Sequence, residues 1–473
     1  MGKWSVRIEN IILENFKNVK YGEINLENKK SDYKASILGL YGQNGSGKTA
    51  LIDAIAVLRY ALSGKKIPIK YADYINIDSE YSHLQFQFQI KNEAALYHVW
   101  YDFSIKKDEI PEEDTLKSLD ETINNYTNYK VTIYDEVLKF NYSDDNTKVR
   151  TETLLDTKNQ TDFQPKAKLT DLFGANKETH TEAKVAYKVS QNDSRSFMFS
   201  KSLLDVINTN CKSERYLTIF NSLVNYGKKE LFVINTENSG LISLNALPIA
   251  FKYRDNDENR EAIGQLALPL NDSVLVPTEM VDMIRQLMTN MNIVLRAIIP
   301  GLEIEVHELN TELFKNAKEG KRLQLTSKRN GKEIPLKYES EGIKKIVSVL
   351  QLLIVVYNSD SITLAIDELD SGIFEYLLGE MLKVISEKGK GQLIFTSHNL
   401  RPLETIDKHF IAFTTVNPNK RFIRFINVKG NNNLRDFYFR DIILGEQAEP
   451  VYETTNNYEI ILAFKEAGRI YGA

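Results

Sequence analysis

The chain contains very little cysteine: Cys211 is the only one among 473 residues. A disulfide framework needs paired cysteines and a cysteine-based zinc site needs several, so the sequence excludes both. Such a chain suits a reducing compartment, and we expect a cytoplasmic protein.

The chain also lacks long hydrophobic runs. No stretch of about 18 apolar residues exists, so we expect no membrane span. The longest apolar stretch lies within 347–357 and predicts a buried helix. The first residues alternate like a strand and lack the apolar centre of a signal peptide, so we expect no leader.

An excess of positive charge is absent too. Lysine and arginine total 60 against 64 aspartate and glutamate, and the net charge is -4, so the chain as a whole is not a basic nucleic-acid binder. With 42% hydrophobic and 26% charged residues, the composition is that of an ordinary globular protein. The length suits two to four domains, or one catalytic domain with a large insertion.

The order of patterns along the chain favours the second option. Strand patterns fill the first 41 residues, a helical pattern follows residue 49, and alternating segments between 84 and 142 predict antiparallel strands. Residues 143–200 are rich in Asp, Asn, Thr and Lys, and predict long loops. Helical patterns return at 201–227 and 277–298, Asn330-Gly331 predicts a hairpin turn, and the last third alternates strands with helices. We therefore expect an α/β fold with residues 1–142 and 301–473 as two halves of one domain, and 143–300 as an inserted, largely helical segment.

One motif carries the chemistry. GQNGSGKT (42–49) follows a buried strand pattern and fits G-x-x-x-x-G-K-[ST]. Glycines at these positions let backbone N–H groups curl around phosphates, Lys48 supplies a positive charge for the β- and γ-phosphates, and the Thr49 hydroxyl can ligate Mg²⁺. We expect ATP to be bound by Gly42, Asn44, Gly45, Ser46, Gly47, Lys48 and Thr49.

A second motif supplies the acidic groups. In ITLAIDE (362–368) an apolar strand ends at Asp367, where the carboxyl ends of parallel strands bind ligands. Asp367 is the expected partner of Thr49 for Mg²⁺, and Glu368 is the expected general base that polarises the attacking water. The two motifs lie more than 300 residues apart, which requires a large insertion within the nucleotide-binding fold.

Five short segments together resemble the ABC-type ATPases of the SMC and RecF kind. NFKNV (15–19) resembles their N-terminal element, and GQNGSGKT has their N-G-S-G-K core. YESEGIKKI (338–346) resembles the signature motif, although Glu341 and Ile343 depart from the usual pattern. LDSGI (369–373) resembles the D-loop and FTSHN (395–399) the switch-histidine motif. The resemblance covers about 1–60 and 335–400.

The resemblance implies a P-loop NTPase that forms two-fold dimers with ATP sandwiched between them. Ser340 and Gly342 would then contact the ATP held by a second subunit, together with Asp370 of the D-loop, and His398 would sense the γ-phosphate. A glutamine near Mg²⁺ is also expected from the resemblance. Gln85, Gln87 and Gln89 alternate on one strand, but a solvated strand face explains them at least as well.

Among such ATPases, the layout resembles the ATPase subunits of bacterial anti-phage defence systems. The length, the ESEG signature and the tail NYEIILAFKEAGR (457–469) are most like the AriA group of PARIS systems, with Septu ATPases, paired with an HNH nuclease, as a close competitor. This resemblance implies a homodimer or higher oligomer that holds a separately encoded effector, such as a Toprim-type nuclease, until a phage product triggers release. Nucleic acid would then be reached through the effector. RecF-like DNA repair is the alternative from another class.

Two features of the tail are less specific. KRFIRF (420–425) is a basic and aromatic strand pattern that could touch phosphate or an acidic partner, but a solvated face is the simpler explanation. Tyr458, Ile460, Ile461 and Phe464 predict an amphipathic helix, and we expect it to dock on its own subunit.

Overall fold

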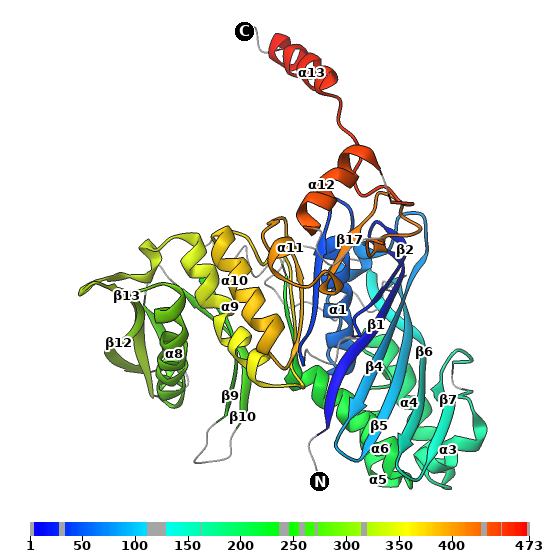
Figure 1. Cartoon of the computed structure of the whole chain (residues 1–473). Coiled ribbons are helices and arrows are strands. Elements are labelled where there is room, and N and C mark those ends of the chain that lie inside the picture. Colours follow the sequence, from blue (N-terminus) through cyan, green and yellow to red (C-terminus); the bar gives the residue numbers. More distant parts are fainter. Residues whose placement is uncertain are drawn as a thin grey trace.

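The computed structural model describes residues 4–27, 34–110, 129–160, 162–235, 246–254, 261–269, 273–313, 319–426, 433–445 and 447–470. Two six-stranded sheets lie against each other with a helix between them, and a smaller lobe extends to one side (Figure 1).

The central sheet carries both nucleotide-binding motifs. Its strand order is β18-β17-β3-β16-β15-β8, and all neighbours are parallel except β18. The strands are β3 (Ser36–Tyr41), β8 (Leu231–Ile234), β15 (Thr363–Ile366), β16 (Gln392–Thr396), β17 (Ile411–Thr414) and β18 (Phe422–Ile423). Parallel strands buried on both faces read as continuous apolar runs, which is how 35–41 and 362–366 were identified in the sequence.

Successive residues of β3 and β16 enter two different cores. Leu38, Leu40 and Ile394 pack with helix α1 (Lys48–Leu62), whereas Ile37 and Phe395 pack on the other face with α9 (Glu341–Asn358) and α10 (Glu375–Lys388). This alternation is the period of two that a strand imposes. Since β16 lies between β3 and β15, the sheet fixes the distance between the two motifs.

The antiparallel sheet covers the other side of α1. Its order is β2-β1-β4-β5-β6-β7, built from β1 (Ser5–Phe16), β2 (Val19–Asn25), β4 (Tyr81–Lys91), β5 (Ala95–Glu109), β6 (Tyr129–Asp144) and β7 (Lys148–Asp156). Helix α1 is apolar on nearly every side because both sheets bury it.

The segment 143–300, which we expected to be an insertion, contributes a strand to each of the two six-stranded sheets. Its residues 148–156 form β7 of the antiparallel sheet, and 231–234 form β8, an edge of the central sheet beside β15. The prediction of long loops for 143–200 is wrong: α3 (Lys166–Phe173) and α4 (Lys177–Asn192) fill much of it. These helices form an outer layer in which each helix buries only one narrow face. Helix α4, for example, buries mainly Ala183, Ala186 and Tyr187. So few apolar residues gave no clear helical pattern in the sequence.

The remaining elements agree with the sequence patterns. Helices α5 (Lys201–Asn210), α6 (Glu214–Asn225) and α8 (Thr278–Ile298) form where they were predicted. A π-helical turn (Tyr226–Glu230) precedes β8, and η1 (Ile69–Tyr74) is a 3₁₀ helix.

The side lobe combines α8 with β11 (Val274–Pro277), β12 (Leu302–Leu313), β13 (Glu319–Arg329) and β14 (Lys332–Pro335). Asn330 and Gly331 both have positive φ and connect β13 to β14, so the hairpin prediction is confirmed. Strands β9 (Ala246–Arg254) and β10 (Glu261–Pro269) form a separate hairpin.

The C-terminal part differs from its prediction twice. Short α11 (Pro402–Thr405), η3 (Leu336–Tyr338) and η4 (Lys408–Phe410) precede α12 (Leu434–Leu444), which packs on β17 through ring contacts of Tyr438 and Phe413. Of the strand pattern at 420–425, only the two residues of β18 form a strand. Helix α13 (Asn457–Ile470) forms as predicted but projects away from its own subunit (Figure 1). Among the described helices, none is both long and apolar enough to cross a membrane.

Candidate functional site

The loop at the end of β3 has the backbone that phosphate binding needs. Gly42, Gly45 and Gly47 all have positive φ, of 151°, 76° and 95°. At Gly42 any side chain is excluded as well, because an added Cβ would lie 1.9 Å from the Thr414 hydroxyl oxygen. Helix α1 begins at Lys48, directly after the loop, so its N-terminal N–H groups point toward the loop.

Lys48 is held inside this loop. Its Nζ donates to the carbonyl oxygens of Gly42, at 2.8 Å, and Gln43, at 3.0 Å. Burial lowers the pKa of Lys48, while the charges of Asp367, Glu368 and Asp370 act in the opposite direction. The ammonium group therefore shares one electrostatic environment with the acidic motif, although more than 300 residues separate them in the chain.

The two acidic residues are positioned by a residue that sequence reasoning missed. Thr396, at the end of β16, donates its hydroxyl to Asp367 Oδ1 at 2.6 Å and accepts the backbone N–H of Glu368 at 2.8 Å. Glu368 has a φ of 48°, a left-handed conformation that a non-glycine residue adopts at a cost of about 1–3 kcal/mol. The Thr396 hydroxyl thus helps to hold the expected base in a strained backbone conformation. The only sequence signal for it was a hydroxyl residue closing the strand before Ser397 and His398.

Asp370 connects the D-loop to the switch loop within the same subunit. Its Oδ2 accepts the backbone N–H groups of His398 and Asn399, both at 3.0 Å. Its Oδ1 is buried without a hydrogen-bond partner among the described residues. The carboxylate therefore fixes the backbone from which the His398 side chain extends.

His398 belongs to the same charged cluster. Burial and then the charge of Lys48 lower the pKa of His398, and the carboxylates of Asp370, Glu368 and Asp367 oppose that shift. The neutral imidazole is favoured by this environment, and a neutral ring can donate one hydrogen bond to a phosphate oxygen. The structure brings Lys48, Asp367, Glu368, Asp370 and His398 together as the sequence predicted.

A second residue missed by sequence reasoning is Lys345, in the second turn of α9. Only 3% of Lys345 is exposed, and its burial lowers its pKa against the opposing charges of Glu368, Asp367 and Asp370. The neighbouring Lys344 instead forms an ion pair with Glu341 on the same helix, at 2.7 Å. The signal in the sequence was the pair of lysines after the signature motif, but nothing there separates their roles.

The signature residues lie at the beginning of α9, beside the D-loop of their own subunit. Ser340 is exposed and caps α9 by accepting the N–H of Ile343 at 3.3 Å. Gly342 packs against the D-loop, where an added Cβ would lie 2.0 Å from the Gly372 carbonyl oxygen. An exposed helix N-terminus beside the D-loop is available to a ligand that approaches from outside the subunit.

The N-terminal element NFKNV forms the β1–β2 turn and lies on the phosphate loop. The Asn18 amide donates to the Gly45 carbonyl oxygen, and Lys17 forms an ion pair with Asp53 of α1. Arg421 in turn donates to the Asn18 carbonyl oxygen at 2.5 Å. The turn and the Arg421 loop thus hold the phosphate loop from one side.

The three alternating glutamines lie on β4 of the antiparallel sheet. Gln87 and Gln89 donate to the two carboxylate oxygens of the buried Glu9, at 2.9 and 3.0 Å, and His98 contacts the same carboxylate at 2.7 Å. These glutamines satisfy a buried charge in the antiparallel sheet, so the structure does not place them at the site.

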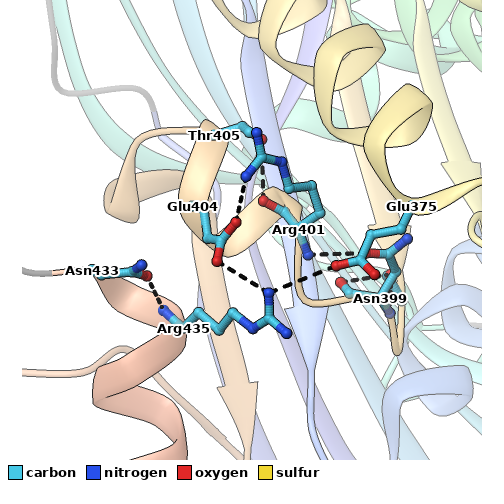
Figure 2. Close-up of polar contacts among 8 residues, drawn as sticks. Glu375, Asn399, Arg401, Glu404, Thr405, Asn433 and Arg435 are labelled. Carbon is cyan, nitrogen blue, oxygen red and sulfur yellow. Dashed lines mark hydrogen bonds and ion pairs between the residues drawn. The ribbon is translucent and has the colours of Figure 1, made fainter.

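An ion-pair network contacts the loop that follows the switch-histidine motif (395–399), as Figure 2 shows. Asn399 Oδ1 accepts the backbone N–H of Arg401 at 2.9 Å, and Arg401 pairs with Glu404 at 2.6 Å. Arg435 of α12 reaches Glu404 at 3.1 Å and Glu375 of α10 at 3.8 Å. The loop carrying His398 is thereby connected to both α10 and α12.

The donor set fits a magnesium ion. Thr49 and Asp367 offer hydroxyl and carboxylate oxygens, the hard ligands that Mg²⁺ prefers, and the site offers no sulfur ligand. The carboxylate of Asp367, in a residue only 1% exposed, is held in place by Thr396. These two residues would hold the ion, which would neutralise phosphate charge when bound.

Comparison with protein-family models assigns the chain. Residues 37–404 match the family described as "AAA domain, putative AbiEii toxin, Type IV TA system". The match spans both nucleotide-binding motifs and most of the chain, so the protein belongs to this family of AAA-domain proteins. A comparison with curated proteins gave no match.

Solved structures with a similar overall course include two kinds of ATPase head. The SMC head domain from Thermotoga maritima is 14% identical, with a TM-score of 0.36, and 89% of this chain and 99% of that chain are covered. The recombination mediator protein RecF bound to ATPrS is 13% identical, with a TM-score of 0.37 and coverages of 89% and 98%. The family match and the geometry of the two motifs define an AAA-domain protein with the phosphate loop of a P-loop NTPase.

Proposed function

We propose that the chain is an ATPase that dimerises around ATP and gates a separately encoded antiviral effector. The observation that carries the ATPase part is the meeting of Lys48, Asp367, Glu368 and His398 at the carboxyl ends of three neighbouring strands. In α/β sheets such edges are where ligands bind.

Each residue has a role that its position supports. The phosphate loop and Lys48 hold the β- and γ-phosphates of ATP, while Thr396 keeps Asp367 and Glu368 in place. Glu368 accepts a proton from the attacking water as that water approaches the γ-phosphorus. His398 donates a hydrogen bond to the γ-phosphate, so its loop registers when that phosphate leaves.

The dimer is supported by the position of the signature. Ser340 and Glu341, the first residue of α9, are exposed beside the D-loop, and a helix N-terminus suits a phosphate chemically. A second copy that approaches the nucleotide edge would satisfy them. Two composite sites related by a two-fold axis would result.

Two observations bear on the effector and the antiviral role. The family description refers to a toxin of a type IV TA system, which fits a protein whose partner or output is harmful when released. The described part of the chain brings the phosphate loop and the acidic residues Asp367 and Glu368 into one site. We propose a toxic nuclease as the gated partner, as in the AriA group of PARIS systems, with ATP turnover as the trigger-controlled step.

Replacing Glu368 with glutamine tests this function. The variant keeps the shape of the site but cannot accept a proton, so steady-state ATP hydrolysis should fall about 10²–10⁴-fold while ATP binding persists. ATP should also shift the variant, more than the wild type, toward a dimer in analytical ultracentrifugation. Undiminished turnover would show that Glu368 is not the base.

For the gating step, the wild-type chain co-expressed with its gene neighbour should retain that protein on purification.

A further inference from the structure

The C-terminal helix α13 carries large apolar side chains but does not bury them against the rest of the described chain. Its residues from 457 to 467 are all exposed, and Figure 1 shows the helix projecting from the molecule. Exposed large side chains cover it, with Phe464 at 78% and Tyr458 at 66%. The others are Ile460, Ile461 and Leu462. Contiguous exposed apolar surface of this kind is typical of interaction sites.

The helix is anchored at the nucleotide edge. The N–H of Glu453 donates to Oε1 of Gln43, inside the phosphate loop, at 2.8 Å. Just before it, Glu449 accepts from the Asn417 amide at 2.9 Å, and the Val416 N–H donates to the Pro450 carbonyl oxygen. The last fixed point therefore lies on the phosphate loop, four residues before α13 begins at Asn457.

The same chain carries an apolar groove of matching character. Helices α8, α9 and α10 enclose about 500 Å³ of space, most of whose walls are apolar. Its lining includes Val294, Ile298, Leu353, Tyr357, Met381 and Val384. One charged residue, Glu380, lies among these side chains. Helix α13 carries Lys465 together with the acidic Glu459 and Glu466. The match between groove and helix therefore rests on their shared apolar character and on a pairing of Lys465 with Glu380.

The groove lies along the half of α9 that is remote from the nucleotide edge. Leu350 to Tyr357 form its α9 wall, whereas Ser340 marks the beginning of that helix at the D-loop. Helix α13 begins four residues after its anchor on the phosphate loop. To reach the groove beside its own α9, it would have to fold back over its own subunit. In an ATP-sandwiched pair, however, the second copy's α9 begins opposite this phosphate loop and runs away from it.

We propose that α13 of each copy lies in the α8–α9–α10 groove of a second copy, so that two helices are exchanged across the ATP-bound dimer. This rests on the sandwiched dimer proposed above. Helix α13, with 14 residues, spans about 21 Å, and the α9 wall of the groove, from Leu350 to Tyr357, spans about 12 Å, so the groove would hold the apolar centre of α13.

Cysteine pairing in the full chain tests the exchange. In a Cys211→Ser, Glu368→Gln background, one preparation carries Phe464→Cys on α13 and another carries Val384→Cys in the groove. Mixed with ATP and a short bismaleimide, the two should give a covalent dimer containing one chain of each kind. A matched preparation with Val189→Cys, on exposed α4, should not cross-link with Phe464→Cys.

The outcomes separate the two proposals. An ATP-induced dimer in sedimentation without this cross-link overturns the exchange and leaves the sandwich standing. Loss of the dimer altogether removes both. A chain carrying both cysteines that cross-links only within itself shows that α13 returns to its own groove, which also overturns the exchange. If the exchange is right, Phe464→Asp should weaken dimerisation at least tenfold while binding of a fluorescent ATP analogue stays unchanged.

Discussion

The hydroxyl of Thr396 gives the clearest test of a single residue. It bridges Asp367 and the backbone of Glu368, and replacing it with valine keeps the shape but removes both hydrogen bonds. We expect Thr396→Val to lower kcat by about tenfold or more, because loss of one preorganised contact near the reacting groups has effects of this order, and to leave ATP affinity nearly unchanged. Single-turnover hydrolysis measures this. Thr157→Val is the control, since that buried hydroxyl bonds the Glu136 carbonyl oxygen in the antiparallel sheet. Equal losses in both variants would indicate general destabilisation.

Lys345 should control how the acidic cluster responds to pH. It is the buried cation facing Glu368, Asp367 and Asp370, so Lys345→Met leaves those negative charges less compensated. We expect the kcat–pH profile of Lys345→Met to differ from that of the wild type, because the substitution removes a buried lysine whose pKa is lowered by burial. Lys344→Met is the control, because Lys344 pairs with Glu341 instead. A profile for Lys345→Met that coincides with the wild type would contradict this role.

At this scale the sequence predicts residues whose neighbours in the chain define a motif. Lys48, Asp367 and Glu368 were identified in this way. Thr396 could not be, because its partners lie 28 and 29 residues away on another strand and only the sheet order brings them together.

Among the elements, the antiparallel sheet holds a pH-dependent contact. The hydrogen bond from His98 to Glu9 raises the pKa of His98 above its ordinary value. The stability it contributes is therefore fully present below about pH 6.5, the unfolded value, and is lost as the pH rises through the folded value. His98→Gln should lower the free energy of unfolding by about 1 kcal/mol at pH 6 and by less at pH 9, which melting curves at the two pH values measure. His83→Gln in the same sheet is the matched control, because the ring of His83 bonds the Ser104 hydroxyl. A deficit in His98→Gln that is equal at both pH values would argue against a charged pair.

The elements that sequence patterns predicted best are those buried on two sides. Strands β3 and β15 and helix α9 read as continuous apolar runs because both faces are covered. Helix α4 was missed because it buries a single narrow face, made of two alanines, one tyrosine and one serine. Strand β8 was missed because four residues are too few to show a period, and its place beside β15 is set by a long-range pairing.

For the whole molecule, the question is whether nucleic acid is a direct partner. The net charge is -4, and the arginines of KRFIRF are occupied internally: Arg424 donates to the Ile411 and Asn25 carbonyl oxygens, and Arg421 to that of Thr415. We expect ATP hydrolysis to be unchanged by duplex DNA, and DNA retention to be absent at 150 mM salt, roughly physiological ionic strength. A DNA-stimulated rate that falls steeply with salt would instead favour the repair function.

The strand order of the central sheet also sets when a newly made chain can become competent. Strand β3 leaves the ribosome early, but its two neighbours, β16 and β17, are synthesised about 350 residues later. At bacterial-type elongation rates, that is a wait of roughly 20–70 s, during which an apolar strand and the glycine-rich loop have no sheet to join. Nucleotide binding therefore cannot precede synthesis of the last third of the chain. A ribosome that stalls before β16 releases a fragment that a chaperone or protease must handle, and one that cannot bind ATP.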